Sequence, residues 1–188
     1  MFIDTIEVNK HPLNISKLIH TPLIIALLLL SSRLGYAQVK QEMLLSDMQV
    51  QIEATQAVND MYNFKFEKAE QQFRWLKQKY AWHPLPYFLL GLSEWWKIMP
   101  NTHDKQYDDK FIAYMDSTIM IGERLIKKED REIEAAFFLA AAYGFKGRLF
   151  STEERKQWRK AAATGKNALK YLEISKGQHD LSPELLFG

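Results

Sequence analysis

Apolar residues recur at intervals of three and four along most of this chain, and no stretch of useful length alternates apolar and polar residues with period two. In residues 66–80, Phe66, Ala69, Phe73 and Leu76 form one stripe, and charged or amide side chains occupy the rest of the surface. This spacing predicts helices and an all-α fold. Because Ala69 is small and lies between two rings, we expect another helix backbone to pass close to it.

The pattern predicts six helices, separated by prolines, glycines and capping side chains. Two prolines within residues 81–86 and a third at Pro100 interrupt the helical pattern, because proline lacks an N–H group and disfavours helical geometry in the residue before it. Glycine at position 147 is expected to end the fifth helix, and a capping box of Ser151 and Glu154 is expected to start the sixth. The predicted helices cover residues 41–61, 66–79, 85–98, 105–127, 130–146 and 151–177.

The first 37 residues have the order of a secretory signal. Basic residues precede an apolar run at 22–30, and Gly35 and Ala37 place small residues at the −3 and −1 positions of a cleavage site. An uncleaved anchor is the alternative, but a nine-residue run is short of the roughly 20 residues needed to span a bilayer. We therefore expect cleavage after Ala37, no stable membrane span afterwards, and a periplasmic or cell-surface protein.

Composition and charge narrow the function further. The chain has no cysteine, so neither a disulfide framework nor lipidation of a cysteine is expected. A formal net charge of +2 lacks the basic excess of a nucleic-acid-binding protein. We expect no nucleic-acid partner.

One pattern recurs along the chain, in which a small residue is followed by further residues four and seven positions later. Partner helices show a related pattern of an aromatic residue followed by small or apolar ones. The first pattern comprises Ala69, Phe73 and Leu76, then Thr118, Gly122 and Leu125, then Ala161, Gly165 and Ala168; the second comprises Tyr87, Leu90 and Gly91, then Phe138, Ala141 and Ala142.

With the segments YFLLG (87–91) and FEKAEQQF (66–73), the chain resembles tetratricopeptide repeat (TPR) proteins of the exported bacterial type. The resemblance covers residues 41–177 as three hairpins. It implies antiparallel helical hairpins stacked as a right-handed α-solenoid, with a repeat domain over residues 38–180. The units are longer than the family's usual ~34 residues, and an irregular helical bundle is the alternative. Ser182, Pro183 and Glu184 look like the start of a further, truncated helix within 181–188, so we expect the chain to stop inside another repeat.

The resemblance also suggests where a partner would bind. It places Trp95 and Trp96 on the late turn of a first helix, which lines the concave face in this family. Adjacent helical residues point about 100° apart, so the two cannot be buried equally, and one is a candidate exposed anchor. The favoured interpretation is that both pack under the loop at 100–110, because tryptophan is usually well buried. Tyr143 is a further candidate apolar contact, and Lys97 or Lys146 would select an acidic partner.

Other chemical groups give weaker signals. Acids beside a histidine near residue 104 could ligate a metal, but acids are also expected at a helix start, so we expect no metal and no cofactor. The histidines at 83 and 179 have no nucleophile or acid at a motif spacing, and no phosphate-binding loop is present. The acidic cluster comprises His103, Asp104, Asp108 and Asp109.

These observations predict a non-enzymatic, exported interaction module that binds a protein segment in the groove of a helical repeat. The alternative is a solute- or glycan-binding component of an outer-membrane uptake system, because aromatic pairs suit sugar stacking. An enzyme is the third possibility.

Overall fold

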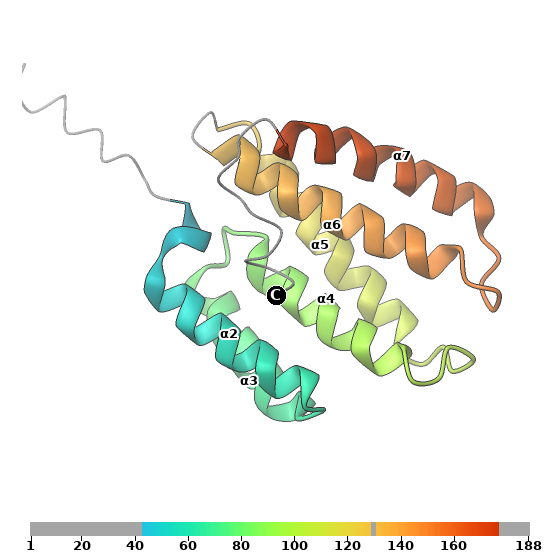
Figure 1. Ribbon diagram of the computed structural model, residues 1–188, viewed down its shortest axis with the longest axis horizontal. Coiled ribbons are helices and arrows are strands. Elements are labelled where there is room, and N and C mark those ends of the chain that lie inside the picture. Colours follow the sequence, from blue (N-terminus) through green and yellow to red (C-terminus); the bar gives the residue numbers. More distant parts are fainter. Residues whose placement is uncertain (1–42, 129–130, 177–188) are drawn as a thin grey trace, which may run out of the picture. The chain divides into compact units, whose positions relative to one another are not determined.

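The structure, a computed structural model, describes residues 43–128 and 131–176, and these residues form helices and connecting turns (Figure 1). The prediction of an all-α fold is confirmed, since no strand occurs within this part of the chain. The predicted signal peptide at 1–37, Gly177 and the segment 181–188 lie outside the described residues. The elements are η1 (Leu44–Ser46), α2 (Met48–Tyr62), α3 (Phe66–Lys79), α4 (Leu85–Ile98), α5 (Asp108–Leu125), α6 (Glu132–Phe150) and α7 (Trp158–Ser175).

Each helix packs on the next one along the chain (Figure 1). The most extensive contacts join α6 to α7 and α4 to α5, and smaller contacts join α2 to α4 and α4 to α6. The helices therefore form a succession of neighbouring pairs, in which the first helices of consecutive pairs also touch.

Local signals explain several helix boundaries. Asp47 caps α2, because its Oδ1 accepts hydrogen bonds from the N–H groups of Gln49 (2.8 Å) and Val50 (3.3 Å). The bounds of α3 and α4 match the predicted ones, and Pro86 lies in the first turn of α4, where the missing N–H group leaves no intrahelical hydrogen bond unmade. The first and fourth predicted helices begin later than expected, at Met48 and Asp108.

Small residues lie where helices pack closely. Ala69 and Phe73 of α3 and Ala142 of α6 are fully buried. A Cβ added to Gly91 of α4 would lie 2.7 Å from Cε of Met115 in α5, so the two helices are too close there for a larger side chain. The small residue at the centre of α3 therefore sits in the packed core, as its position in the stripe indicates.

Two predicted boundaries near residue 150 are wrong. Helix α6 continues through Gly147 to Phe150, and the Ser151 hydroxyl donates to the Arg148 carbonyl oxygen at the end of this helix (2.9 Å) instead of starting the next one. Glu154 is not part of a capping box. It accepts a hydrogen bond from Oγ1 of Thr102 (2.8 Å), and α7 begins only at Trp158.

A long-range ion pair explains why residues 151–157 stay outside a helix. The guanidinium of Arg155 donates to both carboxylate oxygens of Asp108 (2.8 and 2.5 Å) and to the Thr102 carbonyl oxygen (2.5 Å). This side chain is 3% exposed. The segment is therefore tied to the start of α5 by interactions that local sequence patterns do not reveal.

The close approach of α6 and α7 occurs at Gly147. A Cβ there would lie 3.0 Å from Oγ1 of Thr164 and 3.5 Å from the carbonyl oxygen of Ala161. By contrast, a Cβ at Gly165 would meet nothing within 4 Å. Among the described residues, a Cβ at position 147, which the sequence suggested as a helix end, would make a tight contact, and one at 165 would not.

Candidate functional site

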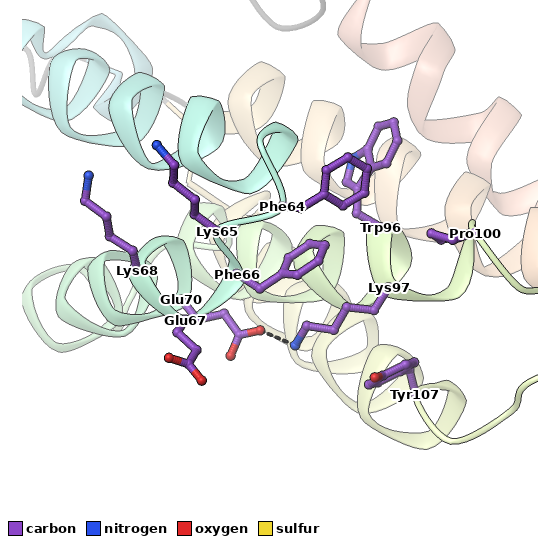
Figure 2. Close-up of a pocket in the computed structure, with 10 residues that line it drawn as sticks. All are labelled: Phe64, Lys65, Phe66, Glu67, Lys68, Glu70, Trp96, Lys97, Pro100 and Tyr107. Atoms are coloured by element: carbon purple, nitrogen blue, oxygen red, sulfur yellow. Dashed lines mark hydrogen bonds and ion pairs between the residues drawn. The ribbon is translucent and has the colours of Figure 1, made fainter.

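A groove of about 730 Å³ opens where the α2–α3 turn meets the end of α4 (Figure 2). Aromatic rings and charged side chains share its lining, and it includes Trp96 and Lys97 from the predicted contact residues. It is lined by Phe64, Lys65, Phe66, Glu67, Lys68, Glu70, Trp96, Lys97, Pro100 and Tyr107.

The turn that presents Phe64 is a Schellman motif closed by a residue other than glycine. The N–H of Phe64 donates to the Met61 carbonyl oxygen, and the N–H of Lys65 donates to that of Asp60, both at 2.9 Å. Phe64 has a φ of 61°, in the left-handed region that glycine normally occupies here. For another residue this conformation costs about 1–2 kcal/mol.

Burial of the ring does not offset this cost. Phe64 is 62% exposed, and its ring lies edge-on to that of Phe66, at 5.9 Å between centroids. The hydrogen bonds of the Schellman motif hold the backbone in this conformation, and residues held in sparsely populated conformations cluster at functional positions. The turn therefore holds an aromatic ring in solvent at the rim of the groove.

Two further rings define the groove. Trp96 is partly buried and packs edge-on against Tyr62, at 5.2 Å between centroids, which limits its rotation. Phe66 and Tyr107 are partly buried on the side nearer Lys97, whose Nζ lies 5.5 and 5.7 Å from their ring centroids. The groove thus offers preordered aromatic surface, a feature typical of binding sites.

Charged residues hold the base of the groove together. Glu70 of α3 accepts a hydrogen bond from Ser93 Oγ (3.0 Å) and forms an ion pair with Lys97, which Figure 2 shows reaching across from α4. The fully buried Glu94 pairs with Lys97 (3.4 Å) and with Lys110 of α5 (2.5 Å). Three consecutive helices are therefore joined by alternating acids and lysines.

The protonation states of this network follow from its contacts. Burial acts to raise the pKa of Glu70, but the hydrogen bonds and charge of Lys97 outweigh it and hold this pKa below its ordinary value. The hydrogen bond to Glu94 raises the pKa of Lys110. Lys97 is therefore already neutralised by two carboxylates, so it positions the groove more than it contributes free positive charge.

The exposed cations of the groove are Lys65 and Lys68. Their side chains are 61% and 63% exposed, and both share Asp60, at 3.7 and 2.8 Å. Asp60 itself is largely buried, with a side chain that is 12% exposed, so both lysines stay paired with it. Each exposed ammonium group keeps further N–H donors that can bind an acidic group of a ligand.

The other predicted contact residues lie elsewhere. Trp95 is 9% exposed and packs against Phe111 and Phe145, so it belongs to the core. Tyr143 stacks on Tyr171 of α7, at 5.9 Å between centroids, and donates a hydrogen bond to Glu123 (3.3 Å). Neither residue lines the groove.

Lys146 also lies outside the groove, where it forms an ion pair between α6 and Asp116 of α5. The groove thus combines two predicted residues, Trp96 and Lys97, with aromatic residues that the sequence analysis did not single out. The signal that could have indicated them is the run of aromatic residues at the break between the first two helices, Tyr62, Phe64 and Phe66.

A second cluster, around the buried Glu134, ties distant segments together. Its carboxylate accepts hydrogen bonds from the N–H of Leu45 (2.9 Å) and from Arg131 (3.1 Å), and Nε2 of His83 lies 3.3 Å away. His83 is fully buried, and its Nδ1 accepts a hydrogen bond from the N–H of Leu85 (3.1 Å), as only an unprotonated nitrogen can. Burial lowers the pKa of His83, although Glu134 acts to raise it, so the ring is neutral.

The predicted acidic cluster is divided among structural contacts. Asp108 pairs with Arg155, and Asp104 accepts a hydrogen bond from the N–H of Gln106 (2.9 Å). The described part of the chain contains no group of three or more potential metal ligands. Among residues 43–128 and 131–176, no helix combines the length and apolar character of a membrane span.

A second groove, of about 630 Å³, runs along α2 and α3, and amide and charged side chains line it in equal number. Trp75, which is 40% exposed, provides aromatic surface within it. The amide groups come from Gln56, Gln71, Gln72 and Gln78.

Fold and grooves define this protein as an all-α chain whose helices pack in succession. No protein-family model, curated protein or solved structure matches it. The resemblance to TPR proteins therefore rests on the residues quoted above.

Proposed function

We propose that this protein is a non-enzymatic, exported interaction module, a TPR-like α-solenoid that binds a partner segment in the groove beside Phe64 and Trp96. The carrying observation is the exposed ring of Phe64, held at the rim of the groove in a left-handed backbone conformation whose cost burial of the ring does not offset. A partner that covers this ring would gain apolar contact without ordering the turn first.

The packing supports the repeat architecture. Neighbouring helices pair in succession, and the contacts of α2 with α4 and of α4 with α6 are those expected when first helices line one face of a stack. Close approaches recur at Gly91 and at Gly122, where a Cβ would lie 2.9 Å from Cγ of Leu139. Both glycines belong to the small-residue pattern in the sequence.

The groove favours a segment with an apolar side chain flanked by an acidic one. Phe64 and Trp96 supply the apolar contact, and the exposed ammonium groups of Lys65 and Lys68 can receive a carboxylate. Export, and hence a periplasmic or cell-surface partner, follows from the signal-like N-terminus.

A peptide array of short segments, varied in apolar and acidic content, tests this proposal. The parent is expected to retain segments that combine the two, Phe64→Ala and Trp96→Ala are expected to lose them, and Trp75→Ala is the matched control because it removes an exposed aromatic ring outside this groove. Equal retention by Trp96→Ala and Trp75→Ala, or no retention by the folded parent, would count against the proposal.

A glycan-binding role is the second candidate, favoured by the amide-rich groove beside Trp75. Amide groups and an exposed indole suit the hydroxyls and ring faces of sugars. On a glycan array the roles reverse: Trp75→Ala is expected to abolish binding and Trp96→Ala to preserve it. The absence of any glycan signal from the parent would remove this candidate.

A further inference from the structure

Helix α7 packs on α6 through one side, yet none of its residues is fully buried. Its contacts with α6 include the Tyr143–Tyr171 stack and the close approach of Gly147 to Thr164. Large apolar side chains nevertheless face solvent: Trp158 is 58% exposed, Leu169 62% and Leu172 40%.

These apolar residues form a regular seam. Trp158, Ala162, Gly165, Leu169 and Leu172 follow one another at intervals of four and three residues, the spacing at which one helix presents a continuous stripe to another. Thr164 and Tyr171, which contact α6, lie outside this series. We refer to these five residues as the α7 stripe.

The glycine in the stripe has no packing explanation among residues 43–128 and 131–176. Glycine destabilises a helix interior relative to alanine, and at Gly91 and Gly122 a neighbouring side chain lies close to the position of the missing Cβ. At Gly165 a Cβ would meet nothing within 4 Å. The surface at Gly165 is therefore open to close approach by a second helix.

We propose that the α7 stripe pairs with the α7 stripe of a second copy of this chain, in an antiparallel arrangement. In this register Leu169 lies opposite Gly165 of the second copy, and Leu172 lies opposite Ala162 of the second copy. Both leucines then face a small residue, and the symmetry repeats both contacts, while Trp158 lies opposite Lys176 of the second copy. A parallel pair would set Leu169 against Leu169 and leave the glycines facing each other across a gap.

Charge along the border of the stripe supports the same register. Arg159, Lys166 and Glu173 follow each other at intervals of seven residues along one edge. Antiparallel pairing brings Arg159 of each copy to Glu173 of the other, which makes two ion pairs, and the exposed Lys166 can extend into solvent. An acidic residue at one end and a basic residue at the other thus makes the edge self-complementary.

Sedimentation of the full chain over a range of concentrations tests the proposal. The parent is expected to form a concentration-dependent dimer, and Leu169→Glu is expected to weaken it by roughly tenfold or more, because a carboxylate would be buried against Gly165 of the second copy. The control is Ala163→Glu, which introduces the same charge at an exposed position of α7 outside the stripe. Circular dichroism verifies that each variant is folded.

Two further variants test the register. Arg159→Glu or Glu173→Arg alone is expected to weaken the dimer, and the double variant is expected to restore it. Gly165→Ala is expected to raise the thermal stability of the monomer and at the same time weaken the dimer. A monomeric parent, a dimer insensitive to Leu169→Glu, or a double variant weaker than both single variants would overturn the proposal.

Discussion

The left-handed conformation of Phe64 predicts a specific order of stability among variants at this position. Replacement by alanine or by glycine removes the ring equally, but alanine keeps the strain at a φ of 61° and glycine relieves it. The relief is about 1–2 kcal/mol, and the greater freedom of glycine in the unfolded chain offsets about 0.4–1 kcal/mol of it. Phe64→Gly should therefore be more stable than Phe64→Ala by roughly 1 kcal/mol.

Urea unfolding followed by circular dichroism measures this difference. With a dependence on urea of about 2 kcal/mol per molar, the midpoint of Phe64→Gly should lie about 0.5 M above that of Phe64→Ala. In thermal unfolding the same difference corresponds to about 2–4 °C for a chain of this size. Both variants are expected to lose the partner segment to the same extent, because both lack the ring.

A matched pair at Gln71 provides the control. This residue is exposed in the interior of α3, where helical geometry favours alanine over glycine by about 1 kcal/mol. The order of the two substitutions should therefore be reversed, with Gln71→Ala the more stable. If Phe64→Ala proves as stable as Phe64→Gly while the Gln71 pair behaves as expected, the turn carries no strain, and the argument for a functional ring at Phe64 fails.

Three other perturbations test the packing and the buried ionisable groups. Gly122→Ala should destabilise the protein by about 1–3 kcal/mol in the same urea assay, because the new Cβ would lie 2.9 Å from Cγ of Leu139. Gly144→Ala is the control: its Cβ would meet nothing within 4 Å, so this variant should be neutral or stabilising. Burial lowers the pKa of His83 in the folded state. Below the ordinary value of 6.5 the unfolded state therefore takes up a proton that the folded state does not bind, and the free energy of unfolding should decrease as the pH is lowered from 6.5. His83→Gln should be less stable than the parent at neutral pH and lose less stability on mild acidification; an unchanged slope would contradict the buried neutral ring. Burial and the nearby Glu123 raise the pKa of Tyr143 from 10.0 to about 12, so stability should fall as the pH rises above 10.0, and Tyr143→Phe should remove one late-ionising tyrosine from an ultraviolet pH titration.

The helix bounds that sequence predicts correctly depend on local signals. The limits of α3 and α4 follow from a break after Tyr62 and from prolines at 84 and 86, whose effects act within a few residues. The limits near residue 150 depend on contacts between distant segments. Arg155 reaches Asp108, and Gly147 lies where α7 approaches α6 closely, so the same residue types that mark helix ends elsewhere do not do so here.

In the candidate site, too, some features follow from local sequence and others depend on contacts between distant segments or on backbone geometry. The sequence indicates that Trp95 and Trp96 point in different directions, but the packing of α5 decides which of them is buried, through the contact of Trp95 with Phe111. Sequence analysis did not identify Phe64, because a helix that ends on a left-handed residue normally carries glycine there. A phenylalanine at that position gives no sign of this conformation and is read only as part of the interruption between two helices. Its significance depends on backbone geometry.

Lys97 and Lys65 show why the charge of a binding surface cannot be read from the number of its lysines. Lys97 has its charge balanced by Glu70 and Glu94, and its ammonium is largely withdrawn from solvent, whereas Lys65 shares an acid across 3.7 Å and stays 61% exposed. The attraction of the groove for an acidic segment should therefore depend on Lys65 and its neighbour Lys68. Substitution of Lys97 should instead disturb the packing of α3 on α4. A salt-dependent loss of binding in Lys65→Gln without loss of stability, and the opposite in Lys97→Gln, would separate recognition from support within one groove.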